Sequence, residues 1–279
     1  MNTTAATVPT ITLNNGVTIP QLGFGVFQVP DAATTDAVAA ALQSGYRSID
    51  TAAIYGNEAG VGEALAESGL ARDEVFVTSK VWNSEHGYDR TLRAFDASLA
   101  ALGLESLDLY LIHWPAPGRG LYLDTWRALE RLHADGRVRA IGVSNFEPEH
   151  LERLVDAGSV VPAVNQVELH PALQNRDVVA ANERYGIATE AWSPLAQGAV
   201  LGDPVISAIA ATHGKTPAQV VLRWHLQQGR IVIPKSVTPR RIAENLAVFD
   251  FALGEADLLA IDALERDGRT GPHPMEFHG

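Results

Sequence analysis

Cysteine is absent from this chain of 279 residues. The sequence therefore has no disulfide framework, no thiolate metal ligand and no cysteine nucleophile. It also has no run of about 18 apolar residues, so we expect no membrane span and no membrane partner. Residues 1–7 contain no basic region that leads into an apolar segment, and we expect no signal peptide. Together these absences indicate a cytoplasmic protein, which we expect to be a monomer.

Basic residues are also scarce, because 21 lysines and arginines face 33 acidic residues and the net charge is −12. This balance argues against a nucleic-acid partner, since phosphate backbones require clustered basic residues. A phosphorylated cofactor needs only one local basic pocket and stays possible. The only lysines are Lys80, Lys215 and Lys235. Where arginine meets nearly every basic need, a retained lysine can reflect a requirement for a compact or titratable charge, although chance is the alternative.

Predicted strands and helices alternate along the whole chain. Strands are expected at 21–25, 47–50, 75–80, 107–113, 138–144, 163–168, 187–192 and 230–235. Helices are expected at 31–42, 58–68, 89–102, 121–135, 148–157, 176–185, 204–212, 217–228, 239–246 and 255–265. The turn signal at Asn14 to Gly16 lies between alternating residues and predicts a small hairpin.

Eight strand–helix units without a linker favour a single domain over residues 1–279. We predict an α/β fold, a (β/α)8 TIM barrel with an N-terminal β-hairpin and accessory helices. The competing fold is an open, doubly wound sheet. Such a sheet would ordinarily carry Gly-x-Gly-x-x-Gly after its first strand, and the sequence from Gly23 to Gly25 lacks the third glycine.

Four ionisable groups lie at or just after the ends of three successive predicted strands: Asp50 and Tyr55, then Lys80, then His113. In a barrel these ends meet at one mouth, where chemistry is located. An ammonium beside a phenol lowers the pKa of the phenol, and a carboxylate holds the ammonium in place. Such a tyrosine can protonate a carbonyl oxygen that gains negative charge. Each residue alone has a structural alternative. Tyr55 could be a packed loop aromatic and Asp50 a turn cap, whereas Lys80 could be a solvated strand end and His113 a satisfied core histidine.

Metal chemistry is not expected. The remaining histidines fit no metal-ligand spacing, and no His-Glu-x-x-His motif occurs.

The sequence resembles the aldo-keto reductases, most closely the bacterial 2,5-diketo-D-gluconate reductase branch. The resemblance runs nearly from end to end, and its most specific motifs are Gly45-Tyr-Arg-Ser-Ile-Asp-Thr-Ala52, Tyr55-Gly-Asn-Glu58, Ile141-Gly-Val-Ser-Asn-Phe146, Asn165-Gln-Val-Glu-Leu-His-Pro171 and Ile233-Pro-Lys-Ser-Val-Thr-Pro-Arg-Arg241. It implies an NADPH-dependent oxidoreductase that reduces aldehydes and ketones without a metal. It also implies that Tyr55 is the general acid, that Lys80 and Asp50 lower its pKa, and that His113 orients the substrate.

The same resemblance assigns the cofactor site. Ser144, Asn145 and Gln166 match the positions that hold the nicotinamide carboxamide, and Trp192 matches the aromatic that stacks on the ring. The loop over the pyrophosphate corresponds to Ser193, Leu195, Gln197 and Gly198. The adenosine end corresponds to Lys235, Ser236, Val237, Arg241, Glu244 and Asn245, of which Lys235 and Arg241 would bind the 2′-phosphate.

Substrates are expected to be small polar carbonyls, such as α-dicarbonyls or keto-sugar acids. The pocket is expected to be lined by Phe24, Ala53, Ile54, Trp82, Asn83 and Trp114. Two rival functions stay open. One is an aldolase in which Lys80 forms a Schiff base, and the other is a non-enzymatic NADPH-binding regulatory subunit. The second would be expected to lose part of the tetrad, and this sequence keeps all four residues.

Overall fold

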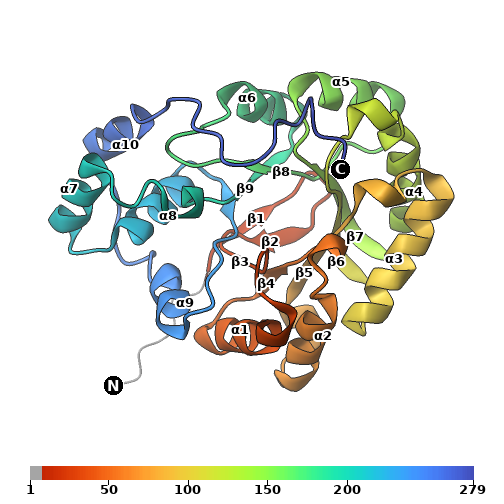
Figure 1. Cartoon of the computed structure of the whole chain (residues 1–279), viewed down its shortest axis with the longest axis horizontal. Helices are drawn as coiled ribbons and strands as arrows, with labels where there is room; N and C mark the ends of the chain where they lie inside the picture. The colour runs from red at the N-terminus through yellow and green to blue at the C-terminus, as the bar shows by residue number, and fades with distance from the viewer. Residues whose placement is uncertain (1–7) are drawn as a thin grey trace.

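The computed structural model describes residues 8–279, whose strands form a closed barrel surrounded by helices (Figure 1). Eight parallel strands have the order β10-β9-β8-β7-β6-β5-β4-β3. A parallel bridge between Leu22 and Val232 joins the two edges, and the amide of Gly23 donates to the carbonyl of Val232 at 2.8 Å. The strands are β3 Phe24–Gly25, β4 Ser48–Asp50, β5 Phe76–Val81, β6 Leu107–Ile112, β7 Val138–Ser144, β8 Val164–Glu168, β9 Ala188–Trp192 and β10 Ile231–Val232. The predicted (β/α)8 barrel is confirmed.

Helices follow the strands around the barrel and cover its outer face (Figure 1). Their bounds are α1 Asp31–Ser44, α2 Glu58–Glu67, α3 Tyr88–Leu102, α4 Tyr122–Ala134, α5 Pro148–Ala157, α6 Arg176–Tyr185, α7 Pro204–His213, α8 Pro217–Gln227, α9 Pro239–Leu246 and α10 Glu255–Asp262. Each predicted helix is present within a few residues of its expected ends. The last strand is shorter than the predicted 230–235, since Pro234 has no N–H with which to continue the ladder.

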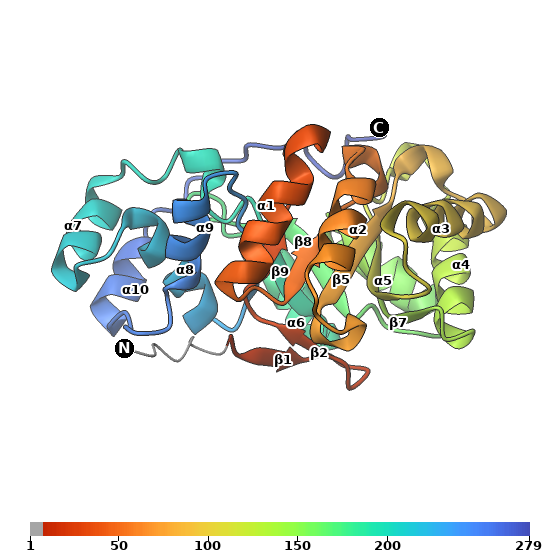
Figure 2. The same cartoon turned by 90° about the horizontal axis from the view of Figure 1, so that it is seen from below.

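The hairpin closes one end of the barrel. Strands β1 Thr10–Thr12 and β2 Thr18–Pro20 pair antiparallel, and Figure 2 shows them beneath the barrel, opposite the end crossed by the C-terminal segment. Ile19 is fully buried and packs in one cluster with Leu109 and Leu111 of β6. The hairpin thus seals the amino-terminal end with apolar side chains and leaves the carboxyl ends of the strands for a site.

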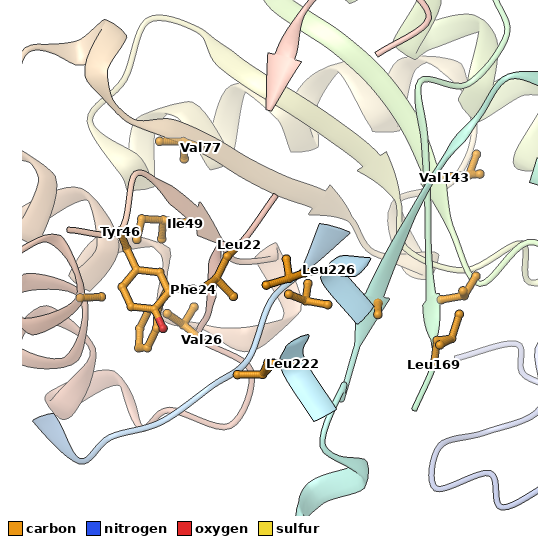
Figure 3. Close-up of a cluster of buried hydrophobic side chains, with 14 of the residues drawn as sticks. Leu22, Phe24, Val26, Tyr46, Ile49, Val77, Val143, Leu169, Leu222 and Leu226 are labelled. Carbon is orange, nitrogen blue, oxygen red and sulfur yellow. The ribbon is translucent and has the colours of Figure 1, made fainter. Parts of the chain in front are cut away.

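A second cluster of apolar side chains lies between the sheet and the helices (Figure 3). Leu22, Phe24 and Ile49 pack in it together with Leu222 and Leu226 of α8. None of the helices within residues 8–279 is long and apolar enough to cross a membrane. The expectation of no signal peptide in 1–7 lies outside the described residues, and a single domain over 1–279 stays a prediction.

Candidate active site

The centre of the barrel mouth is a buried ion pair. Lys80, on β5, is fully buried, and its Nζ lies 2.7 Å from Oδ1 of Asp50, the last residue of β4. The same Nζ donates to the backbone carbonyl of Thr51 at 2.8 Å. The two residues meet because β4 and β5 are parallel neighbours in which Asp50 pairs with Thr78, two residues before Lys80. A buried ammonium is tolerated only when a counter-charge and hydrogen bonds compensate its lost hydration, and both are present.

Tyr55 and His113 lie next to this pair. A short 3-10 turn, η1 Ala53–Tyr55, follows β4 and brings the half-buried Tyr55 back over the strand ends. The Lys80 Nζ is 5.2 Å from the centroid of the Tyr55 ring, and the ring of His113 lies edge-on to Tyr55 with centroids 5.6 Å apart. The structure therefore brings all four predicted residues together at one mouth.

The charge states of these groups follow from burial and from their neighbours. Burial raises the pKa of Tyr55 more than the nearby Lys80 ammonium lowers it. Lys80 does lower the pKa of Tyr55, but the net pKa is above that of an ordinary tyrosine. The prediction of an unusually acidic phenol is therefore wrong. Burial alone would lower the pKa of Lys80, but Asp50 and Tyr55 raise it above its usual value. Burial, with Lys80 and His86 nearby, keeps the pKa of His113 well below its usual value. At neutral pH the site thus holds a protonated phenol, an ammonium and a neutral imidazole.

Gln166, on β8, connects the pair to a further carboxyl group. Its side-chain nitrogen donates to Oδ2 of Asp50 at 2.8 Å and to Oε2 of Glu190 at 2.9 Å. Its backbone carbonyl accepts a hydrogen bond from the Ser144 hydroxyl at 2.8 Å. Glu190 lies on β9 and is buried, and sequence reasoning missed it although it pairs in register with Gln166 on the neighbouring strand. Of the expected cofactor residues, Gln166 is thus hydrogen-bonded directly to the tetrad, and Ser144 is connected to it through Gln166.

Asn145 and Trp192 extend this network around the mouth. Asn145 donates to the backbone carbonyl of His113 at 2.9 Å and accepts from the Trp192 indole N–H at 2.8 Å. Asn145 and Ser193, which directly follow β7 and β9, have positive φ angles of 64° and 46°. Such angles are uncommon outside glycine and concentrate at functional sites. The half-buried indole of Trp192 is held in a fixed orientation beside the strand ends.

The other expected cofactor residues lie on two segments. Ser193, Leu195, Gln197 and Gly198 belong to the loop after β9, which contains the 3-10 turn η5 Ala196–Gly198. Lys235, Ser236 and Val237 follow β10, whereas Arg241, Glu244 and Asn245 lie on α9. Lys235 and Arg241 are exposed, and no side chain caps the first turn of α9. This helix start therefore has free backbone N–H donors, which suit a phosphate group.

The expected pocket residues are only partly at the mouth. Trp82 lies edge-on to His113 with centroids 5.1 Å apart, and Trp114 lies 6.4 Å from Trp192. Ala53 and Ile54 are on η1 beside Tyr55, and Asn83 is buried with both side-chain polar atoms unpartnered among the described residues.

Phe24 is a correction. It is buried in the core against Tyr46, since successive strand side chains point to opposite faces (Figure 3). Phe27, which was not predicted, is 47% exposed, and its ring centroid lies 5.1 Å from that of Tyr55.

The C-terminal segment crosses the mouth, as Figure 2 shows from the side. The buried Glu168 carboxylate accepts from the amides of Thr270 and Gly271, and these bonds, with one from His170, lower its pKa although burial alone would raise it. Further along, the ring of Phe277 lies 4.6 Å from that of Trp114 and 6.1 Å from that of Trp82. Phe277 is therefore a wall of the pocket; the sequence led us to expect that the segment 269–279 shapes the rim, without singling out this residue.

Other parts of the described chain offer no comparable constellation. A cavity of about 740 Å³ lies by the hairpin at the amino-terminal end, but its Arg47 donates to backbone carbonyls and its Arg139 to Asp108. Within residues 8–279 no group of three or more His, Asp or Glu side chains could hold a metal ion.

Comparison with known proteins identifies the family to which the chain is similar. A sequence profile of the Aldo/keto reductase family matches residues 21–266. The chain is 54% identical over 269 residues to the Glyoxal reductase of Bacillus subtilis (strain 168), which covers 96% of this chain and 97% of the relative. It is 52% identical over 271 residues to the Methylglyoxal reductase DkgA of Yersinia pestis, which covers 96% and 97%. The crystal structure of a Gox0644 D53A mutant in complex with NADPH superimposes with a TM-score of 0.93 at 52% identity, over 96% of this chain and 98% of that one.

Proposed function

The chain belongs to the aldo/keto reductase family, and we propose that it reduces small dicarbonyls and related polar carbonyls with NADPH, with Tyr55 as proton donor. The observation that carries this proposal is the contact of Tyr55 with the buried Lys80–Asp50 pair and with His113 at one mouth. NADPH is the cofactor of the solved relative Gox0644 D53A, and glyoxal and methylglyoxal reductases are among the relatives.

The residues at the mouth divide the chemical work. When bound, NADPH would supply the hydride for the carbonyl carbon. Tyr55, protonated at neutral pH, gives its proton to the carbonyl oxygen as that oxygen gains charge. The Lys80 ammonium stabilises the resulting phenolate, and Asp50 keeps that ammonium charged and in place. The neutral imidazole of His113 offers an N–H to the same oxygen and so fixes its position.

The residues also fit the cofactor. Both N–H bonds of the Gln166 amide are used by the carboxyl groups of Asp50 and Glu190, so its carbonyl oxygen is left to accept from the nicotinamide carboxamide. The Trp192 ring offers a face for stacking, worth about 0.5–1.5 kcal/mol beyond area burial. The exposed Lys235 and Arg241, beside the uncapped start of α9, would take the 2′-phosphate that distinguishes NADPH from NADH.

The shape of the mouth favours small substrates. Trp82, Trp114 and Phe277 form aromatic walls, and the C-terminal segment is held across the opening by Glu168. Polar groups at the base, His113 and the Tyr55 hydroxyl, would fix one carbonyl oxygen. Glyoxal, methylglyoxal and keto-sugar acids match this combination of aromatic walls and polar base. We expect the chain to act as a monomer and propose no further partner.

The rival Schiff-base function conflicts with the state of Lys80. A nucleophilic lysine must be neutral, and catalytic lysines achieve this through a lowered pKa. Asp50 and Tyr55 raise the pKa of Lys80 instead, and its Nζ is engaged by Asp50 and by the Thr51 carbonyl.

The test is turnover by the purified chain, followed as the loss of NADPH absorbance with glyoxal, methylglyoxal and a panel of other carbonyls. We expect turnover with dicarbonyls, and we expect Tyr55→Phe to abolish it while NADPH binding stays within about twofold, because the phenyl ring keeps its contacts. Binding of NADPH without turnover of any carbonyl would instead support the regulatory subunit. Normal turnover by Tyr55→Phe would remove Tyr55 as the proton donor.

A further inference from the structure

Glu190 is a buried acid that the proposed reaction does not use. It lies on β9 and is 1% exposed, and its Oε2 accepts from the Gln166 side-chain nitrogen at 2.9 Å. The same nitrogen donates to Asp50, so the carboxyl groups of Asp50 and Glu190 share one amide. Only one ammonium, that of Lys80, is paired with them, and it is bound to Asp50. A second buried acid beside an already neutral ion pair is costly, and no surface role accounts for it.

The geometry gives Glu190 two effects on the mouth. First, it fixes the Gln166 amide: with both N–H bonds directed at carboxyl groups, the amide cannot rotate without losing a hydrogen bond. Second, it adds a titratable charge one side chain away from where the nicotinamide would lie. The oxidised nicotinamide ring carries a positive charge, whereas the reduced ring is neutral.

We infer that Glu190 is a positioning residue for the cofactor: it fixes the amide of Gln166 and, when ionised, favours the oxidised, positively charged nicotinamide over the reduced one. This inference rests on the proposed function, since it requires the nicotinamide to meet Gln166.

The ionisable groups around Glu190 make its titration separable from theirs. Burial, together with the charge of Asp50, raises the pKa of Glu190 to about 8, although Gln166 and Lys80 act in the opposite direction. Across the mouth, the pKa values of Tyr55 and Lys80 are raised above their usual values, and that of His113 lies well below its own. Among these groups Glu190 is therefore the one that titrates between about pH 7 and about pH 9.

The decisive measurement is the ratio of the dissociation constants of NADPH and NADP⁺ as a function of pH. Titration of the 2′-phosphate affects both forms alike and cancels in this ratio. For the wild-type chain we expect the preference for NADP⁺ to increase about fivefold between about pH 7 and about pH 9. Glu190→Gln keeps the length and an acceptor oxygen for Gln166 but cannot ionise, so its ratio should stay flat. An equal increase in Glu190→Gln would overturn the electrostatic part of the inference.

A second variant tests the positioning part. Glu190→Met has a similar length but no acceptor, so the Gln166 amide keeps only its hydrogen bond to Asp50 and is less firmly fixed. We expect NADPH to bind about fivefold more weakly to it, whereas Glu190→Gln should bind within about twofold of the wild type. Asp108→Asn is the matched control, because Asp108 is also a buried strand carboxylate but lies near the amino-terminal end of β6. Unchanged NADPH binding by Glu190→Met would refute the positioning role.

Unfolding experiments without any cofactor separate a failure of this inference from a failure of the proposed function. The pKa of Glu190 is raised on folding, so the folded chain holds its proton more tightly and loses stability as pH rises toward about 8. Glu190→Gln lacks this loss, and its stability relative to the wild type should therefore increase from about pH 5 to about pH 8. A difference in stability that stays constant with pH would overturn the titration of Glu190. If the expected pH dependence were found but the chain failed to bind NADPH, only the proposed function would be overturned.

Discussion

Two lysines of this chain have nearly the same contacts and differ mainly in burial. Lys80 lies 2.7 Å from Asp50 and 5.2 Å from the centroid of the Tyr55 ring. Lys215 lies 2.6 Å from Asp250 and 5.1 Å from the centroid of the Phe251 ring. The side chain of Asp250 is 66% exposed, whereas that of Asp50 is 4% exposed. Comparing Lys80→Met with Lys215→Met therefore isolates how burial of the ion pair affects stability and how its position at the barrel mouth affects turnover.

The expected losses of stability differ several-fold. Lys80→Met leaves the Asp50 carboxylate buried without a counter-charge, and breaking a buried pair in this way costs about 3–5 kcal/mol. Lys215→Met breaks a pair whose carboxylate is well hydrated, and such pairs contribute about 0–1 kcal/mol. Adding Asp50→Asn to Lys80→Met removes the isolated charge, so the double variant should regain about 2 kcal/mol or more. Denaturant unfolding followed by circular dichroism measures all of these values.

Activity should separate from stability in the same set of variants. Lys80→Met and the double variant should both lose turnover of methylglyoxal about 100-fold or more, because the phenolate of Tyr55 is no longer stabilised. Lys215→Met should be fully active. If Lys80→Met were no less stable than Lys215→Met, the reasoning about the buried pair would be refuted. If it were unstable but fully active at a temperature where it is folded, Lys80 would be a structural residue only.

Three further predictions concern the cofactor, the substrate and pH. Arg241→Ala should raise the Michaelis constant for NADPH about tenfold and that for NADH less than about twofold, because an ion pair with the 2′-phosphate is lost. Arg240→Ala is the neighbouring control, and equal effects of Arg241→Ala on both cofactors would contradict the phosphate assignment. Phe277→Ala should increase turnover of bulky aromatic aldehydes relative to methylglyoxal; an unchanged ratio in steady-state assays would remove Phe277 from the pocket wall. The rate should show no step near pH 6.5, since burial holds the pKa of His113 well below that value and the imidazole stays neutral; a step that disappears in His113→Gln would contradict this.

The site residues at the strand ends could be predicted from the sequence, because the carboxyl ends of all strands in a parallel barrel lie at the same mouth. Asp50, Lys80 and His113 each follow or end an apolar run, and the register of β4, β5 and β6 brings such residues to one rim. The same rule found Gln166 and Trp192. It required no knowledge of loop conformation, since the sheet alone fixes where a strand ends.

Residues away from strand ends could not be found in this way. Phe24 was misassigned because the sequence does not reveal which face of a two-residue strand points into the barrel, and the mouth aromatic is Phe27, beyond that strand. Phe277 follows a long segment without regular structure, so no periodic pattern indicates where it returns to the barrel. The C-terminal segment is held by hydrogen bonds from its backbone to Glu168 and, next to Phe277, from Arg119 to the His278 carbonyl, and the sequence does not encode these as a motif.

The direction of the Tyr55 pKa shift could not be predicted from the neighbouring residues alone, because it also depends on burial. Proximity to Lys80 was predicted and is present, yet burial reverses the net effect, because removing a phenolate from water costs more than one ammonium returns when Asp50 already neutralises that ammonium. A carboxylate that fixes the lysine also weakens its field at the phenol. The pair is therefore better suited to keep Tyr55 protonated until charge develops on the substrate oxygen than to generate a phenolate beforehand. For the proposed reduction, a tyrosine that is protonated in the resting protein is the form that can give a proton to the substrate oxygen.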